Sequence, residues 1–258
     1  MKDDFLILLT NDDGLGAPGI SALEASLRQV SRVVVVAPSE EKSGVSHALT
    51  IHQPIRILEK GRNRFAVTGT PADCVIFALT KILPAPPDLV VSGINNGPNL
   101  GDDVHYSGTV AGAREAALRQ LPAIAVSLAS RFDSFDFGPA AEFVRALVEQ
   151  LSLDVMPPGT YWNVNIPDGK IRGYRFTRQG SRLAFAAIEE KRDPRGRPYY
   201  WIGRDDSEGL AEPDTDYEAI RDQVVSITPL QPDHTDYRAL TDYLRGSCKL
   251  TFNGAPKE

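Results

Sequence analysis

Two continuous apolar runs with one helical repeat between them constrain the fold of this chain more than any other feature. The runs are residues 5–9, Phe-Leu-Ile-Leu-Leu, and residues 33–37, Val-Val-Val-Val-Ala. A run in which every side chain is apolar is typical of a strand buried on both faces, as in a parallel sheet. Between the runs, Ile20, Leu23 and Leu27 recur at helical spacing, so residues 18–30 are expected to form a helix. Strand, helix and strand in this order predict a right-handed βαβ unit.

The same alternation continues through the first 160 residues. Thr70 and Pro71 are typical of an N-cap and a first helical position, and prolines from Pro84 onward end that helix near residue 83. Further strands are expected at residues 89–92 and 123–128, further helices at 110–120 and 138–151, and a hairpin from residues 49–58 and 64–68. This order predicts an α/β fold, with a Rossmann-like, mostly parallel sheet flanked by helices.

The remaining residues, 161–258, show a different pattern. Looser alternation of apolar and polar residues favours strands at 161–166, 171–177, 183–189, 199–203 and 224–228. The alternation at 171–177 and 183–189 is more typical of antiparallel strands. A helix is expected at 235–244. We expect a metal- and phosphate-binding core over residues 1–160 and a β-rich extension over 161–258 with a hairpin arm. Both parts are expected to form one structural unit.

Composition excludes several classes of protein. The net charge is −6 and no basic tract is present, which argues against binding of a nucleic-acid polymer. Cys74 and Cys248 lack metal-ligand spacing, as expected in a reducing compartment. The chain does not start with a signal-peptide pattern, and its apolar stretches fall short of the roughly 18 residues of a membrane span. We therefore expect a cytoplasmic protein that does not contact membranes.

Oxygen-bearing side chains follow three of the expected strands. Asp12 and Asp13 follow the first, Ser43 follows the second, and Asn95 follows the strand at 89–92. Because ligands bind outside the carboxyl ends of strands in open α/β sheets, these side chains are expected to meet at one edge. Two adjacent carboxylates repel one another, and two carboxylates, a hydroxyl and an amide oxygen suit Mg²⁺, Mn²⁺ or Ca²⁺. The alternative is that the aspartates only form a turn or cap the next helix.

The same stretch also matches a dinucleotide-binding fingerprint. Gly14, Gly16 and Gly19 have the spacing G-x-G-x-x-G after a strand, and Glu40 follows the second strand. That fingerprint places a pyrophosphate beside the first glycine, where Asp12 and Asp13 would repel it. A dinucleotide-binding oxidoreductase is therefore the weaker of two alternatives to a metal-dependent enzyme. The other alternative is a sensor that binds a nucleotide or metal without turnover.

A second candidate site lies at the start of the helix expected over residues 110–120. Ser107, Gly108 and Thr109 precede it, and a helix N-terminus presents free N–H groups and a positive dipole end to an anion. The alternative is a plain N-cap by Thr109. Asn99 lies in a loop rich in glycine and proline, where forming a turn is the commoner role.

Several further motifs occur in order over nearly the whole chain. They are Leu9-Thr10-Asn11-Asp12-Asp13-Gly14, Ala37-Pro38 with Ser43-Gly44, Gly69-Thr70-Pro71-Ala72-Asp73, Ser92-Gly93-Ile94-Asn95, Gly97-Pro98-Asn99, Tyr106-Ser107-Gly108-Thr109, Asn163-Val164-Asn165-Ile166-Pro167, Thr215-Asp216 and Ser226-Ile227-Thr228-Pro229-Leu230. In this combination the chain resembles the SurE survival-protein nucleotidases, a family of metal-dependent phosphomonoesterases.

The resemblance implies roles for individual residues and for the whole protein. It implies metal ligands at Asp12, Asp13, Ser43 and Asn95, holding one divalent cation per subunit, with Mg²⁺ or Mn²⁺ favoured. It implies catalytic roles for Asp12, Asp13 and Asn99, and phosphate contacts at Asn99, Ser107, Gly108 and Thr109. The implied reaction is hydrolysis of nucleoside 5′- or 3′-monophosphates, and also of short polyphosphate. The implied assembly is a homodimer or homotetramer with exchanged C-terminal elements.

Overall fold

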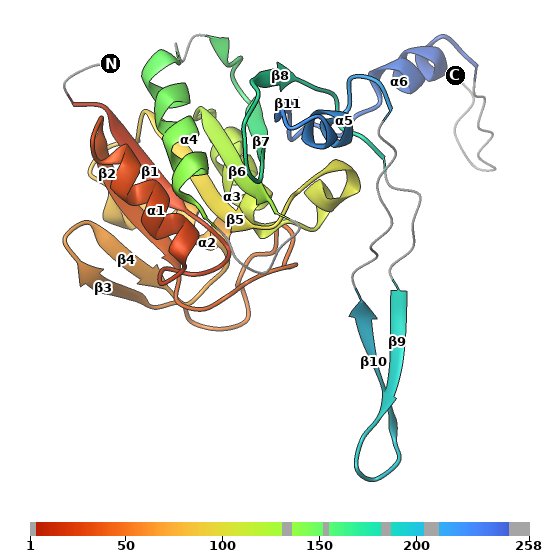
Figure 1. Ribbon diagram of the computed structural model, residues 1–258, viewed down its shortest axis with the longest axis horizontal. Coiled ribbons are helices and arrows are strands. Elements are labelled where there is room, and N and C mark those ends of the chain that lie inside the picture. Colours follow the sequence, from red (N-terminus) through yellow and green to blue (C-terminus); the bar gives the residue numbers. More distant parts are fainter. Residues whose placement is uncertain (1–3, 131–135, 152–154, 182–186, 204–211, 248–258) are drawn as a thin grey trace, which may run out of the picture.

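A nine-stranded sheet with helices on both faces forms the body of the molecule (Figure 1). The structure is a computed structural model that describes residues 4–130, 136–151, 155–181, 187–203 and 212–247. The strand order is β3-β4-β2-β1-β5-β6-β7-β11-β8. The α/β class and the mostly parallel sheet expected from the sequence are confirmed.

The parallel part of the sheet is centred on β1 (Leu6–Thr10). It pairs in parallel with β2 (Arg32–Pro38) on one side and β5 (Leu89–Asn96) on the other. Outside these lie β4 (Arg64–Val67), β6 (Ala123–Ala129) and β7 (Tyr161–Pro167), each also parallel to its inner neighbour. Ile7, Leu8 and Leu9 of β1 are fully buried, which explains the continuous apolar run.

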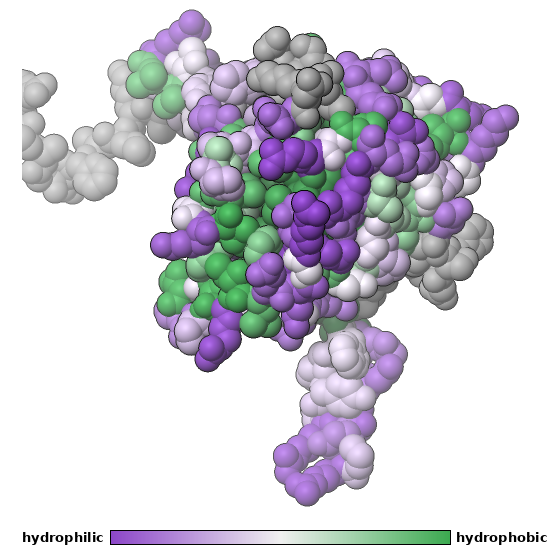
Figure 2. Space-filling model, turned by 90° about the vertical axis from the view of Figure 1, so that its left-hand side faces the viewer, coloured by the Kyte–Doolittle hydropathy of each residue, from purple (hydrophilic) through white to green (hydrophobic). Residues whose placement is uncertain are grey.

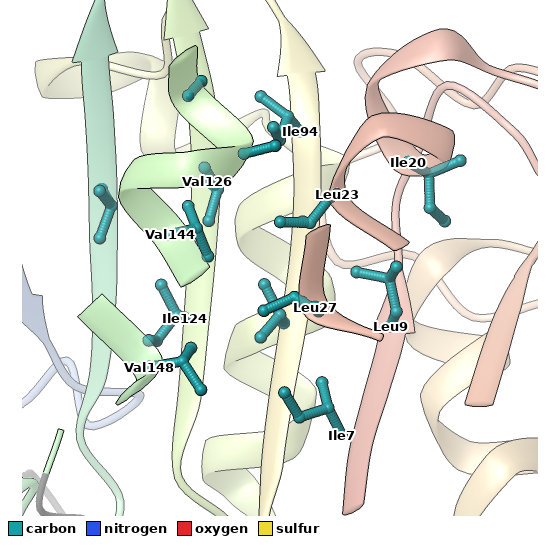
Figure 3. Packing of buried hydrophobic residues seen from close by; sticks show 14 of the residues in the cluster. Ile7, Leu9, Ile20, Leu23, Leu27, Ile94, Ile124, Val126, Val144 and Val148 are labelled. Atoms are coloured by element: carbon teal, nitrogen blue, oxygen red, sulfur yellow. The ribbon is translucent and has the colours of Figure 1, made fainter. Parts of the chain in front are cut away.

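Two helical layers cover the sheet. On one face, α1 (Pro18–Leu27) and α4 (Gly138–Gln150) pack over β1, β5 and β6, and Figure 3 shows their side chains meeting Ile7, Leu9 and Ile124. On the other face lie α2 (Pro71–Phe77), continued by the π-helical turn η1 (Ala78–Ile82), and α3 (Gly108–Leu118). In the described part of the chain, none of the helices is long and apolar enough to cross a bilayer.

The edges of the sheet differ from the central part in strand direction. β3 (Ile57–Gly61) pairs antiparallel with β4, and β11 (Val225–Leu230) pairs antiparallel with β7. β8 (Tyr174–Phe176) pairs in parallel with β11, so the antiparallel pairing expected for residues 171–177 is wrong. The short loose pattern there predicts a strand but carries no information on the direction of its partner. Because β7, β11 and β8 belong to the same sheet as β1, the domain boundary near residue 160 stays a prediction.

Several element boundaries also differ from the sequence-based expectation. The hairpin strand expected at residues 49–58 starts only at Ile57, because the backbone N–H groups of Thr50 and Arg56 donate to side chains of Asp73 and Thr68. The helix expected over 18–30 ends at Leu27, and β5 runs on to Asn96. As expected, Thr70 caps α2, and it does so in a capping box with Asp73.

The C-terminal extension contains a hairpin arm and two short helices. β9 (Ala187–Arg192) and β10 (Pro198–Gly203) pair only with each other, and two views show this hairpin projecting from the body (Figures 1 and 2). Most of the strand expected at 183–189 lies outside the described residues. α6 (Tyr237–Leu244) matches the expected terminal helix, whereas α5 (Asp216–Arg221) and the 3-10 turn η2 (Gly101–His105) were not expected.

Candidate metal and phosphate site

The candidate site lies where the strand order of the sheet reverses. From β1 the chain builds β2 and β4 on one side, and then β5, β6 and β7 on the other. The loops leaving β1 and β5 therefore diverge and open a crevice at the carboxyl ends of these strands, where ligands bind in open α/β sheets. Asp12 and Asp13 follow β1 directly, and Asn95 and Asn96 end β5.

Asp12 is held against the start of α3. Its Oδ1 accepts a hydrogen bond from the Thr109 hydroxyl, and the Thr109 backbone N–H also donates to this carboxylate. Gly108 permits the approach, because a Cβ there would lie 2.8 Å from the Asp12 Cβ and 2.9 Å from its Oδ2. Burial raises the pKa of Asp12 above its ordinary value, and the Thr109 hydrogen bonds offset only part of this effect.

Asp13 is more exposed than Asp12 and also carries uncompensated charge. Burial, and next the neighbouring Asp12, raise the pKa of Asp13 to about 6, although a hydrogen bond from the Asn96 backbone lowers it. Glu41 adds negative charge close to both aspartates. Among the described residues, no basic side chain contributes to the pKa of either carboxylate. The pair therefore lacks a counter-charge that a divalent cation would supply.

The chain neighbours of Ser43 and Asn95, which are Lys42 and Asn96, hydrogen-bond to the two aspartates. The Lys42 backbone N–H donates to the Asp12 carbonyl at 2.7 Å, which places the loop after β2 next to β1. Ser43 is exposed, and its hydroxyl donates to Glu41 Oε1 at 2.9 Å. The Asn95 amide nitrogen donates to the Gly97 carbonyl at 2.9 Å, so the amide oxygen is the end turned away from that bond.

The donor chemistry of this set fits a hard divalent cation. It combines two carboxylates with a hydroxyl and an amide oxygen, which are the ligand types of Mg²⁺ and Mn²⁺. Three or more His, Cys, Asp or Glu residues do not gather into a metal-binding group anywhere in the described residues. A site built from Asp12, Asp13, Ser43 and Asn95 is compatible with that finding, because only two of its members are acidic.

Asn99 is fixed by a buried hydrogen-bond network. Its backbone N–H donates to Asn165 Oδ1 at 2.8 Å, and its carbonyl accepts from the side chains of Asn163 and Asn165 at 2.8 and 3.0 Å. Its own amide nitrogen donates to Ser127 Oγ at 2.7 Å. An amide nitrogen has two N–H groups, so a second donor stays available for a phosphate oxygen.

Asn163, Asn165 and Ser127 were not predicted as site residues from the sequence. The signal was the spacing of Asn163 and Asn165, since residues two apart in a strand point to the same face. The Asn163 amide oxygen is buried without a hydrogen-bond partner in the described residues. Asp216 holds the chain just after Asn99 in place. Its carboxylate accepts hydrogen bonds from the backbone N–H groups of Gly101 at 2.8 Å and Gly180 at 2.9 Å.

Ser107, rather than Thr109, caps α3. Its hydroxyl oxygen accepts from the Val110 backbone N–H at 3.0 Å, and Ser107 has the extended backbone of an N-cap. The alternative of an N-cap at Thr109 is therefore wrong by two residues, because Thr109 is already helical and fully buried. Since Thr109 donates to Asp12, it positions that carboxylate, and its contact with phosphate stays a prediction.

Comparison with known proteins decides the family. The family model described as "Survival protein SurE" matches residues 7–185. The chain belongs to the SurE family. It is 48% identical over 249 residues to a protein named 5′-nucleotidase SurE from Syntrophotalea carbinolica, covering 96% of this chain and 100% of that one.

Two further comparisons cover most of this SurE-family chain. A protein named 5′-nucleotidase SurE from Alkalilimnicola ehrlichii is 47% identical over 237 residues, or 91% of this chain and 92% of that one. The crystal structure of the SurE protein from Aquifex aeolicus superposes with a TM-score of 0.81 at 42% identity. That alignment covers 93% of this chain and 99% of the other. The resemblance noted in the sequence is thereby confirmed.

Proposed function

We propose that the chain is a metal-dependent phosphomonoesterase that hydrolyses nucleoside 5′-monophosphates to nucleoside and phosphate. The observation that carries this proposal is the uncompensated Asp12–Asp13 pair at the point where the strand order reverses, held against the start of α3. The relatives named 5′-nucleotidase SurE support the same reaction. They do not favour the oxidoreductase or the sensor without turnover.

Asp12, Asp13, Ser43 and Asn95 would hold one divalent cation, with Mg²⁺ or Mn²⁺ favoured by the all-oxygen set. A cation bound there would polarise the phosphoryl group and promote attack by water. Thr109 keeps the Asp12 carboxylate oriented, and Asp13, which is more exposed, accepts a hydrogen bond from the attacking water. Both aspartates are thereby assigned to catalysis as well as to metal binding.

The phosphate group is assigned to the residues between β5 and α3. The free N–H of the Asn99 amide donates to a phosphate oxygen, and the Asn163–Asn165 network keeps that amide in place. Ser107, Gly108 and Thr109 supply the helix N-terminus, whose positive dipole end favours the anion. Gly108 allows Asp12 to lie directly against this helix start, so the assigned phosphate position is next to the Asp12 carboxylate.

Nucleoside 3′-monophosphates and short polyphosphate are proposed as further substrates. The contacts assigned to the cation, Asn99 and the start of α3 involve only one terminal phosphoryl group, which these compounds also carry. Phosphate release should be measured from a panel of 5′- and 3′-nucleotides with Mg²⁺ or Mn²⁺. Release from at least the 5′-monophosphates is expected. Tight nucleotide binding without release would indicate the sensor, and absorbance changes specific to NAD would indicate the oxidoreductase.

We propose a homodimer or homotetramer as the working assembly, located in the cytoplasm. The hairpin β9–β10 exposes Ile188, Tyr200, Trp201 and Ile202, with 59–79% of each residue accessible. A two-stranded hairpin alone buries little apolar surface and leaves unpaired edges that favour pairing with another chain. α6 likewise has no buried residue and exposes Leu244. The cytoplasmic location rests on the two cysteines without metal-ligand spacing.

A further inference from the structure

The loop Asn99–Gly101, here called the phosphate loop, is held by side chains of the C-terminal extension, residues 161–258. Both backbone polar groups of Asn99 bond to asparagines of β7, as described above. The Gly101 N–H donates to Asp216 Oδ2 at 2.8 Å, and the Gly101 carbonyl accepts from the side-chain amide of Gln179 at 2.9 Å. The loop that carries the assigned phosphate ligand is therefore fixed from the extension.

Close packing adds to these hydrogen bonds. The Tyr217 hydroxyl donates to the Leu100 carbonyl at 3.3 Å. Gly101 has φ +50°, and a Cβ there would lie 2.7 Å from Tyr217 Cε2. A Cβ at Gly180 would lie 2.6 Å from Tyr217 Cδ2. The tyrosine ring therefore fits between the phosphate loop and Gly180 only because both positions lack a side chain.

Asp216 connects the phosphate loop to the segments on either side of the hairpin arm. Its Oδ2 accepts from Gly101, and its Oδ1 accepts from the N–H groups of Gly180, which precedes the arm, and Tyr217, which follows it, each at 2.9 Å. The side chain is fully buried, and no basic side chain among the described residues pairs with it. Both oxygens are therefore needed as acceptors, since the only bonds observed come from backbone donors.

The metal half of the site is held from a different part of the chain. In the described residues, the hydrogen bonds to the two aspartate carboxylates come from Thr109, the Asn96 backbone and the Asp12 backbone. All three precede residue 161. The metal ligands and the phosphate loop are therefore positioned by separate sets of contacts.

We propose that Asp216 is a positioning residue for the phosphate of the substrate. By joining Gly101 to the extension, it fixes the phosphate loop so that the Asn99 amide meets the phosphate oxygen beside the cation. Without this hold, the loop would have to become ordered when phosphate binds, and the loss of its conformational freedom would weaken binding. The inference rests on the proposed phosphomonoesterase function, because it takes the assigned contact between Asn99 and phosphate as given.

The cation and the phosphate are then expected to respond differently to a change in the extension. A loosened phosphate loop leaves the two aspartates in place, so the affinity for Mn²⁺ stays while the affinity for phosphate falls. A purely structural role of Asp216 would instead lower both affinities together, because unfolding removes both sites.

The substitution Asp216→Asn tests the proposal with little change of shape. Asparagine has one acceptor oxygen, and its amide group would face the N–H of either Gly101 or Gly180, so one hydrogen bond is lost. Asp214→Asn is the matched control, because it removes the same charge from an exposed side chain, and asparagine also adopts its φ of +63°. Gln179→Met, at a partly exposed residue, is a second variant that removes the donor to the Gly101 carbonyl.

Calorimetry with inorganic phosphate as the probe, at saturating Mn²⁺, is the main measurement. We expect about tenfold weaker phosphate binding to Asp216→Asn, a smaller loss in Gln179→Met, and wild-type affinity in Asp214→Asn. Binding of Mn²⁺ alone is expected to stay within about twofold of the wild type in all three variants. The KM for AMP should rise about tenfold in Asp216→Asn at a Mn²⁺ concentration that saturates both proteins.

The outcomes separate this inference from the proposed function. Unchanged phosphate affinity in both Asp216→Asn and Gln179→Met would overturn the positioning role, and so would a parallel loss of Mn²⁺ affinity. If Asp216→Asn does not unfold cooperatively in urea, Gln179→Met decides. AMP hydrolysis by the wild type with unchanged phosphate binding in the variants would overturn the positioning role alone. Weakened phosphate binding in the variants of a wild type that releases no phosphate from AMP would overturn the proposed function alone.

Discussion

Replacing Asp13 by Asn should stabilise the metal-free protein at alkaline pH. The pKa of Asp13 is raised from 3.8 to about 6 in the folded chain. Ionised Asp13 is therefore less favourable in the folded than in the unfolded protein. Asparagine keeps the shape and an oxygen that accepts the Asn96 N–H, but it carries no charge to repel Asp12.

The size of the effect follows from the pKa difference. At about 1.4 kcal/mol per pKa unit, the shift corresponds to about 3 kcal/mol, and solvent screening of this partly exposed side chain reduces it to about 1–2 kcal/mol. Between the unfolded-state pKa of 3.8 and the folded-state pKa of about 6, the folded protein binds more protons at Asp13 than the unfolded protein does. The stability that protonated Asp13 contributes is therefore fully present below pH 3.8 and is lost as the pH rises through 6. The gain from Asp13→Asn is therefore complete above pH 6 and small near pH 4.

Urea unfolding in the presence of a chelator, at pH 8 and at pH 4.5, measures this gain. We expect the free energy of unfolding of Asp13→Asn to exceed that of the wild type by about 1–2 kcal/mol at pH 8, and by less at pH 4.5. With Mn²⁺ in excess, the wild type should gain stability and the variant should gain much less. A variant that is less stable than the wild type at pH 8 without metal would refute the reasoning.

Three further predictions concern the helix start and the assembly. Thr109→Val removes the hydroxyl that donates to Asp12; we expect a loss of about 1–3 kcal/mol in stability by urea unfolding and slower phosphate release, and wild-type values would contradict this contact. Ser107→Asp keeps an N-cap but places negative charge at the phosphate position; we expect lost phosphatase activity with Mn²⁺ binding retained by calorimetry, and unchanged turnover would reject the phosphate role. Sedimentation at micromolar concentration should show a dimer or tetramer, and a monomer alone would contradict the proposed assembly.

The main elements of the fold are predictable because local signals agree with burial. The strands β1 and β2 are buried on both faces and so appear in the sequence as unbroken apolar runs. The start of α2 is predictable because Thr70 and Pro71 act locally. The pairing of β8 with β11 was not predictable, since strand direction at the sheet edge depends on chain segments distant in sequence.

The metal-binding part of the candidate site could be predicted from the sequence, whereas the network that holds Asn99 could not. Asp12 and Asp13 stand out because Ser43 and Asn95 follow two other strands of the same sheet, whereas the aspartates alone would also be typical of a turn or a helix cap. The network around Asn99 did not stand out, because the contacts with Asn163 and Asn165 span 64 and 66 residues. The close packing of Gly108 on Asp12 is likewise a long-range contact, visible only once α3 lies beside β1.

The central claim is that Asp12 and Asp13 bind a divalent cation that is required for phosphomonoester hydrolysis. The most direct measurement is phosphate release from AMP by protein stripped of metal, before and after addition of Mg²⁺ or Mn²⁺. We expect no release from the stripped wild type and restored release with the cation, with Asp12→Asn and Asp13→Asn staying folded but nearly inactive. Full activity in demonstrably metal-free wild-type protein would contradict the claim.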